Sequence, residues 1–129
     1  MSVAGIGIDA VNIQRFAEVS GSRGEPFLRR IFTRNELEYA GAKKAYYIHM
    51  AGKFAAKEAV KKALPDGARI GLAWTDIEIL NETDGKPYVK LHGKARSLME
   101  ESGLSDVVVS ISHTEELALS NAMAVKNGS

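Results

Sequence analysis

Two acidic side chains, Asp9 and Glu58, lie beside small and apolar residues, where a charged side chain is unexpected. Together they could bind a hard divalent cation. Asp9 ends the run GIGID, in which glycine and isoleucine alternate, and Glu58 lies in HMAGKFAAKEAVKKAL, residues 49–64. Magnesium is typically bound by one or two protein carboxylates, while water and substrate phosphate complete its octahedron. We therefore predict that Asp9 and Glu58 hold magnesium, with Lys62 beside Glu58 to bind an anion.

The segment that contains Glu58 has the pattern of a helix with one buried side. At about 100° per residue, its small residues and Ile48 fall on one arc, and three lysines fall on a separate, solvated face. Glu58 and Lys62 lie at the edge of the apolar arc, four residues apart. Two interpretations stay open: a surface ion pair worth roughly a few tenths of a kcal/mol, or a half-buried carboxylate that awaits a cation. The apolar arc consists of Ile48, Ala51, Gly52, Ala55, Ala59 and Ala63, and the solvated face consists of Lys53, Lys57 and Lys61.

The glycines that precede Asp9 suggest that something approaches this strand closely. Alternate residues of a strand share a face, so Gly5 and Gly7 lie on the same face as Asp9, and the two isoleucines lie on the other. Glycines on that face leave room for a neighbouring helix or for a ligand near the carboxylate. The sequence does not separate these two explanations, and both can hold.

The other predicted elements place these residues in a mixed fold. Thr33 and Glu36 match a capping box, so a helix should begin at Arg34, and Pro65-Asp66-Gly67 should end the long helix. The order of elements predicts one α+β domain over residues 1–129, with a largely antiparallel sheet packed against the long central helix. The expected strands cover 3–9, 74–80, 87–91, 107–112 and 117–125; the expected helices cover 10–19, 46–64 and 94–102, besides the one from Arg34; the expected loop covers 20–25.

Composition excludes several classes of site. The chain has no cysteine, which excludes disulfides, thiolate zinc sites and a cysteine nucleophile, and its three histidines are scattered. A formal net charge of +1 gives no general case for binding nucleic acid. The N-terminal residues have neither a basic leader nor a long apolar run, so we expect a cytoplasmic protein without a membrane segment.

Two segments in the expected order resemble the signatures of a known family. GIGIDAVNIQRF, residues 5–16, and MAGKFAAKEAVKKAL, residues 50–64, are similar to the two motifs of the holo-acyl-carrier-protein synthases, which are small bacterial 4′-phosphopantetheinyl transferases. The similarity continues through RRIFTRNELEYA, TDIEILNETDGKPYVKL and VVVSISHTEE, and so spans nearly the whole chain. Two motifs at the expected separation are more specific than either alone.

The resemblance implies a reaction and a metal. The family transfers the phosphopantetheine arm of coenzyme A to a serine of apo acyl carrier protein, releases adenosine 3′,5′-bisphosphate, and requires magnesium. Asp9 and Glu58 match the metal ligands of the family, and Lys62 matches a lysine near the transferred phosphate. The serine proton would pass to Glu58 or to a metal-bound water, and the sequence does not choose between them. The resemblance also implies the 4′-phosphopantetheinyl transferase fold and a homotrimer with active sites between subunits.

The resemblance further implies residues that contact the two substrates. Lys53 stands where many members have arginine, so it keeps the charge but loses the bidentate phosphate geometry. Coenzyme A contacts are expected at Lys53, Lys62, Gly85, Lys86, Pro87, Ser112, His113 and Thr114. The resemblance also implies a contact with the acidic carrier protein at Arg15. From the residues alone, Arg15, Arg30 and Arg34 could form a basic patch for the carrier with Phe16 as an apolar anchor, so contacts are expected at Phe16 and Arg30 as well; solvated arginines and core packing of Phe16 are the alternatives.

Three other interpretations are weaker. Gly5, Gly7 and Ala10 match a relaxed dinucleotide-binding fingerprint, but the strand and the ribose-binding acid that should follow are missing. Ser112 and His113 are neighbours on a strand and point to opposite faces, so they cannot act as nucleophile and base. A non-catalytic module that binds coenzyme A or the carrier remains the alternative function, although such a module would be expected to lose one of the three charged site residues.

Overall fold

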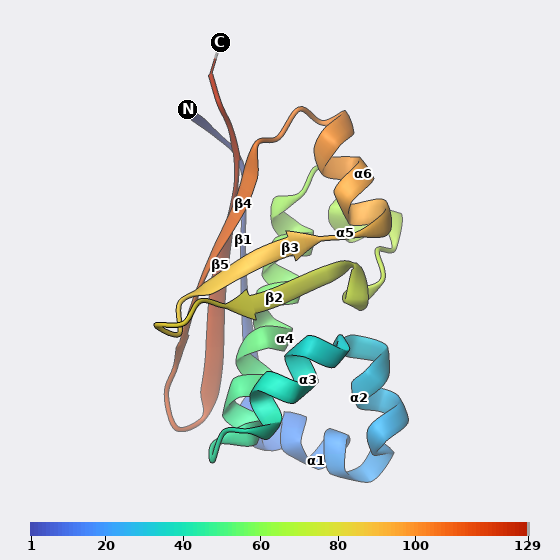
Figure 1. Cartoon of the computed structure of the whole chain (residues 1–129), viewed down its shortest axis with the longest axis vertical. Helices are drawn as coiled ribbons and strands as arrows, with labels where there is room; N and C mark the ends of the chain where they lie inside the picture. The colour runs from blue at the N-terminus through green and yellow to red at the C-terminus, as the bar shows by residue number, and fades with distance from the viewer. Residues whose placement is uncertain (129) are drawn as a thin grey trace.

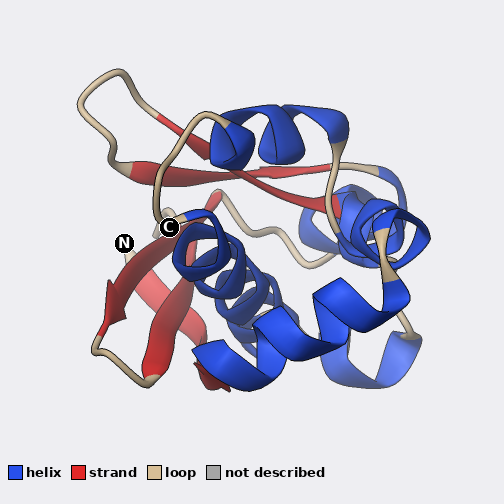
Figure 2. Ribbon diagram, turned by 90° about the horizontal axis from the view of Figure 1, so that it is seen from below, coloured by secondary structure: helices blue, strands red, loops and turns tan. Residues whose placement is uncertain are grey.

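The computed structural model of the chain describes residues 1–128, with the backbone alone at residues 68 and 69. A three-stranded antiparallel sheet packs one face against the long helix α4 (Tyr46–Ala63), as Figure 1 shows. A two-stranded hairpin and the shorter helices cover the rest of α4, which is seen nearly end-on in Figure 2. In this described part of the chain, no helix combines the length and the apolar character needed to cross a membrane.

The elements follow one another in the order β-α-α-α-α-α-β-β-α-β-β, with a short 3₁₀ helix before the second strand. The strands are β1 (Ser2–Asn12), β2 (Ile77–Asn81), β3 (Pro87–Leu91), β4 (Asp106–His113) and β5 (Leu117–Lys126). The other helices are α1 (Ile13–Arg23), α2 (Glu25–Ile31), α3 (Arg34–Gly41), α5 (Gly67–Ile70), α6 (Gly93–Glu101) and the 3₁₀ helix η1 (Trp74–Asp76).

Small residues line the inner face of the large sheet, whose strand order is β1-β5-β4. Gly7 of β1 pairs with Ala122 of β5, which pairs in turn with Val109 of β4, and Asp9 pairs with Ser120. Because paired residues in an antiparallel sheet point to the same side, each such row presents one face to α4. On β1 and β5 this face consists mostly of glycine, alanine and serine, which lets the helix backbone lie close to these two strands.

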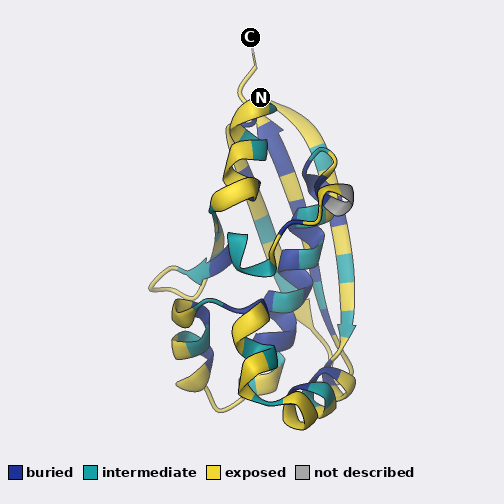
Figure 3. Ribbon diagram, turned by 90° about the vertical axis from the view of Figure 1, so that its right-hand side faces the viewer, coloured by how far each residue is buried: buried dark blue, intermediate teal, exposed yellow. Residues whose placement is uncertain are grey.

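The helix α4 runs through the centre of the core, and Figure 3 shows it as the most buried helix. One apolar cluster joins its C-terminal half to both sheets, and the other joins its N-terminal half to α1, α2 and α3. The predicted apolar arc is confirmed, because all four alanines on it are 2% exposed or less. This burial fixes the rotation of α4, and with it the directions of the charged side chains on its other faces.

The predicted element boundaries were right where a local signal was strong. The capping box of Thr33 and Glu36 is present, α3 begins at Arg34, and α4 starts and stops within one residue of the prediction. The helix expected over 10–19 begins at Ile13 instead, because β1 continues to Asn12, whose Oδ1 accepts a hydrogen bond from the Arg15 backbone N–H.

Two other expectations need correction. The loop expected over 20–25 is wrong, since α1 continues to Arg23, and α2 begins directly after Gly24, which has φ 74°. The sheet is antiparallel as predicted, but β2 and β3 form a separate two-stranded sheet. The expected strand over 74–80 is helical at its start, so Trp74 lies outside β2.

Candidate active site

The two glycines of β1 allow the strand to touch the backbone of α4. A Cβ added at Gly5 would collide with the carbonyl oxygen of Ala63, and one added at Gly7 would collide with that of Ala59. The glycines therefore serve close packing of strand on helix, which is one of the two explanations left open above. The same packing holds the next residue of that face, Asp9, against the helix surface.

Asp9 is paired with Lys62. The Nζ of Lys62 lies 3.2 Å from Oδ1 of Asp9 and donates a hydrogen bond of 2.8 Å to the carbonyl oxygen of Ile8. The Asp9 side chain is 21% exposed and that of Lys62 is 48% exposed. An ion pair this open to water contributes less than about 1 kcal/mol to stability. The pair therefore orients two charged groups at the surface more than it stabilises the fold.

The packing register of β1 on α4 relates the position of Glu58 to that of Asp9. Two residues along β1, from Gly5 to Gly7, correspond to four residues back along α4, from Ala63 to Ala59. These steps are nearly equal, because two strand residues rise about 6.6 Å and four helix residues about 6 Å. A Cβ on Gly7 would lie 2.9 Å from Cβ of Lys62, so we expect the same step along both elements to bring Glu58 toward Asp9.

Glu58 has a partner that the sequence did not predict. The indole Nε1–H of Trp74 donates a hydrogen bond of 2.5 Å to Oε1 of Glu58. Lys62 pairs with Asp9 instead of with Glu58. The first interpretation, a surface ion pair between Glu58 and Lys62, is therefore wrong. Glu58 is half-buried, as the second interpretation required.

These two carboxylates make a fitting donor set for magnesium. Both offer hard oxygen ligands, and each keeps at least one oxygen atom or lone pair outside its protein hydrogen bond. Within residues 1–128, no group of three histidine, aspartate or glutamate side chains gathers in a way that could hold a metal ion. Two carboxylates alone suit a magnesium ion that takes its remaining ligands from water and a bound phosphate.

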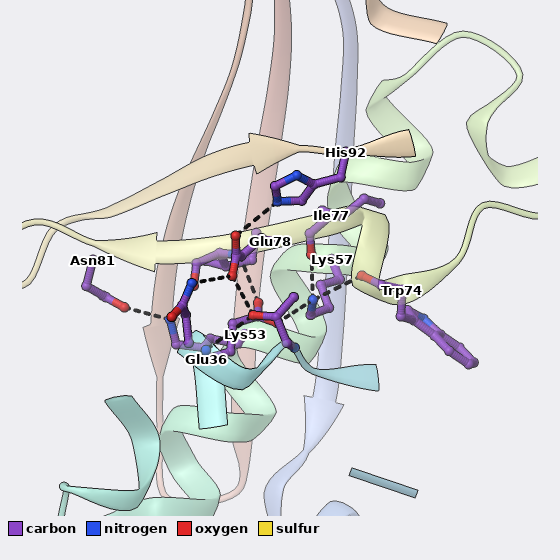
Figure 4. A network of polar contacts seen from close by, with 11 residues as sticks. Glu36, Lys53, Lys57, Trp74, Ile77, Glu78, Asn81 and His92 are labelled. Atoms are coloured by element: carbon purple, nitrogen blue, oxygen red, sulfur yellow. Dashed lines mark hydrogen bonds and ion pairs between the residues drawn. The ribbon is translucent and has the colours of Figure 1, made fainter. Parts of the chain in front are cut away.

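The face expected to be solvated carries two buried lysines, so this prediction was wrong. Lys57 is fully buried, and its Nζ lies 2.8 Å from Oε1 of Glu36, whose side chain is also fully buried. Lys57 also donates hydrogen bonds to the carbonyl oxygens of Trp74 and Ile77, as Figure 4 shows. Burial lowers the pKa of Lys57, and the charge of Glu36 opposes this shift.

The two lysines occupy the free edge of β2. The strand β2 pairs only with β3 in its sheet, so its other edge would leave backbone groups without partners. Lys57 binds the carbonyl of Ile77, Lys53 binds that of Ile79, and Glu36 accepts from the backbone N–H of Ile79 (Figure 4). Side chains thus replace a third strand, which the helical wheel could not anticipate.

Several of the residues expected to contact coenzyme A line one cavity. Lys53, Gly85, Pro87 and His113 border a space of about 200 Å³ between α4, the β2–β3 turn and the end of β4. Lys53 is only 3% exposed, and its Nζ donates to Ile79 and Asn81. Burial lowers the pKa of Lys53 to about 8. Lys86, Ser112 and Thr114 are exposed and lie outside the lining of this cavity.

Sequence reasoning missed other residues of this cavity. Tyr39, His49 and Asn81 line it beside the expected residues. Burial lowers the pKa of His49, and the positive charges of Lys43 and Lys53 lower it further. His49 lies three residues before Gly52 and four before Lys53 on α4, so these three residues share the side of the helix that borders the cavity.

Of the three residues expected to contact the carrier protein, two lie on the surface and one lies in the core. Arg15 on α1 and Arg30 on α2 are exposed. Phe16 is 6% exposed, and its ring packs against Phe32 and Phe54, with centroid distances of 6.2 and 5.6 Å. The expected carrier contact at Phe16 is therefore wrong, since its ring is part of the core.

Comparison with known proteins agrees with the geometry. The family model described as the 4′-phosphopantetheinyl transferase superfamily matches residues 5–120. The chain is 43% identical over 120 residues to the holo-[acyl-carrier-protein] synthase of Caldanaerobacter subterraneus, and the match covers 93% of each protein. It is 44% identical over 121 residues to that of Caldicellulosiruptor saccharolyticus, covering 94% of this chain and 95% of the relative.

Solved structures give the same result. The holo-ACP-synthase of Plasmodium yoelii superposes with a TM-score of 0.84 at 31% identity and covers 98% of both chains. The Helicobacter pylori synthase in complex with coenzyme A gives a TM-score of 0.80 at 29% identity, over 92% of this chain and 98% of that one. Agreement in sequence and fold over most of the chain shows that it belongs to the 4′-phosphopantetheinyl transferase superfamily, among the holo-[acyl-carrier-protein] synthases.

Proposed function

We propose that the chain is a cytoplasmic, magnesium-dependent transferase that moves 4′-phosphopantetheine from coenzyme A to a serine of apo acyl carrier protein. Adenosine 3′,5′-bisphosphate is the other product. The observation that supports the proposal is the packing of β1 on α4, which pairs Asp9 with Lys62, one turn of the helix from Glu58, in a chain from this family. The named relatives and the coenzyme A complex of one of them support the two substrates.

The residues of the site would have different roles in phosphoryl transfer. Asp9 and Glu58 would hold magnesium, which when bound neutralises phosphoryl oxygens and orients the leaving group. Lys62 places a positive charge within reach of the same phosphates, and an arriving phosphate would compete with Asp9 for it. Catalysis of this reaction consists mostly of positioning and charge stabilisation, which fixed side chains of this kind supply.

We further propose a homotrimer with active sites between subunits. Ile6, Ile8, Val108 and Met123 lie on the outer face of the large sheet, are 39–70% exposed and border a groove of about 700 Å³. A second copy of the chain would cover this apolar face. Glu58 and Lys53 are five residues apart, which is about 140° around α4. One coenzyme molecule would therefore contact the Asp9 and Glu58 carboxylates of one subunit and the Lys53 cavity of its neighbour more readily than both sites of the same subunit.

A sedimentation measurement tests the trimer. The wild type should sediment with three times the mass of one chain, and Ile8→Glu should shift it to the monomer because a charge would be buried in the interface. Tyr88→Gln, which changes a 40% exposed aromatic side chain on β3, should leave the trimer intact. A wild type that stays monomeric at micromolar concentration would overturn the assembly.

Mass spectrometry tests the transfer itself. After incubation with apo carrier protein, coenzyme A and magnesium, the carrier should gain the mass of one phosphopantetheine group at a single serine. Arg15 and Arg30 are proposed to bind the acidic carrier, so the rate at low carrier concentration should fall as salt is added. Bound coenzyme without any gain in carrier mass would favour the non-catalytic binding module instead.

A further inference from the structure

Trp74 contacts a single stripe of α4 that contains the proposed metal ligand Glu58. Its indole N–H donates to Glu58, and its ring lies 6.0 Å from that of Phe54 between centroids. Nζ of Lys61 lies 4.5 Å above the indole ring, an arrangement in which a cation is attracted to the aromatic face. The stripe has the spacing i, i+3, i+4, i+7 at residues 54, 57, 58 and 61, which places all four on one side of a helix.

The backbone of Trp74 is held by the most buried charge of the stripe. Nζ of Lys57 donates to the Trp74 carbonyl at 3.0 Å while it is paired with Glu36 (Figure 4). Trp74, three residues before β2, is thus fixed at its carbonyl and at its ring. A residue fixed at these two points can define the position of a third group bound to its indole N–H, here the carboxylate of Glu58.

We infer that Trp74 is a positioning residue whose indole N–H holds Glu58 in the orientation that binds the metal, an inference that rests on the proposed function. The N–H occupies one lone pair of Oε1, so Oε2 and the other lone pair of Oε1 remain for a cation. Groups that hydrogen-bond to a metal ligand orient it, and their loss typically lowers metal affinity or activity about 10- to 100-fold. A purely structural tryptophan would need its ring in the core but not this bond.

The hydrogen bond can be tested first without metal or substrate. Trp74 is the only tryptophan of the chain, so an ¹H–¹⁵N spectrum contains one indole signal. In the wild type this signal should lie downfield because the N–H donates to a carboxylate, and it should move upfield in Glu58→Ala. The exposed Glu101→Ala on α6 is the control and should leave it in place. An indole signal that Glu58→Ala does not move would overturn the inference.

The effect on the metal is then measured with Trp74→Phe, which keeps an aromatic ring against Phe54 and Lys61 but removes the N–H. We expect its affinity for Mn²⁺, measured by electron paramagnetic resonance on the protein alone, to fall about tenfold. The magnesium concentration for half-maximal rate should rise by the same factor, while the rate at saturating magnesium should change much less. Equal metal requirements in Trp74→Phe and the wild type would overturn the positioning role.

Failure of the underlying function gives a different pattern. A wild type that shows the downfield indole signal but takes up no Mn²⁺ would refute the metal assignment of the proposed function, and this inference with it. A wild type that binds Mn²⁺ but does not modify any apo carrier would refute the transfer alone. In that case a weaker Mn²⁺ affinity in Trp74→Phe would still support the role of Trp74.

Discussion

Replacing Asp9 by asparagine should lower the rate of transfer at a fixed, subsaturating magnesium concentration by roughly 10²-fold or more. The amide keeps an oxygen for Lys62, so the hydrogen bond of 3.2 Å can persist while the negative charge is lost. A metal ion contributes several kcal/mol to stabilising the transition state, and each 1.36 kcal/mol corresponds to about a tenfold change in rate. Steady-state rates across a magnesium titration measure the effect, and Glu58→Gln should behave alike.

The fold should not change in these variants. Asp9 is 21% exposed and its ion pair is open to water, so the melting temperature of Asp9→Asn should stay close to that of the wild type. Glu101→Gln, which removes an exposed carboxylate on α6, is the matched control and should keep full activity. If Asp9→Asn or Glu58→Gln turned over at nearly the normal rate at the same subsaturating magnesium concentration, the assignment of the two carboxylates as metal ligands would be wrong.

The parts of the site that the sequence could predict are those set by local patterns. GIGID shows which residues share a face with Asp9, and the glycines require a close neighbour whatever that neighbour is. The wheel of residues 49–64 identified the buried alanines, and therefore the edge on which Glu58 lies. These patterns do not show that the two segments meet. The contacts of Gly5 and Gly7 with the backbone of α4 show that they do.

The parts that could not be predicted depend on which element covers a charged face. A wheel assigns lysines to solvent because an isolated ammonium is costly to bury, and Lys53 and Lys57 are exceptions because β2 offers them unpaired carbonyls. That edge exists only because β2 and β3 separate from the main sheet, which no local pattern of the chain indicates. Trp74 was expected to begin a strand, and its side chain would then have had no fixed relation to Glu58.

The largest loss of stability is expected when one partner of the buried ion pair is removed. In Lys57→Met, the carboxylate of Glu36 stays fully buried without its cation, and the carbonyls of Trp74 and Ile77 lose a donor. Removing one partner of such a pair typically costs about 3–5 kcal/mol, a large part of the roughly 5–15 kcal/mol that stabilises a domain. Chemical denaturation should show this loss as a lower midpoint with an unchanged slope.

An exposed pair of nearly equal length provides the comparison. Arg96 and Glu100 lie 3.0 Å apart on α6 with side chains 70% and 64% exposed, so Arg96→Ala should cost less than about 1 kcal/mol. The double variant Glu36→Gln/Lys57→Met should lose less stability than the sum of the losses in its two single variants. Each single variant leaves one buried charge without a partner, whereas the double variant leaves none. A Lys57→Met variant no less stable than Arg96→Ala would show that the pair does not hold β2 and the Trp74 segment against α4.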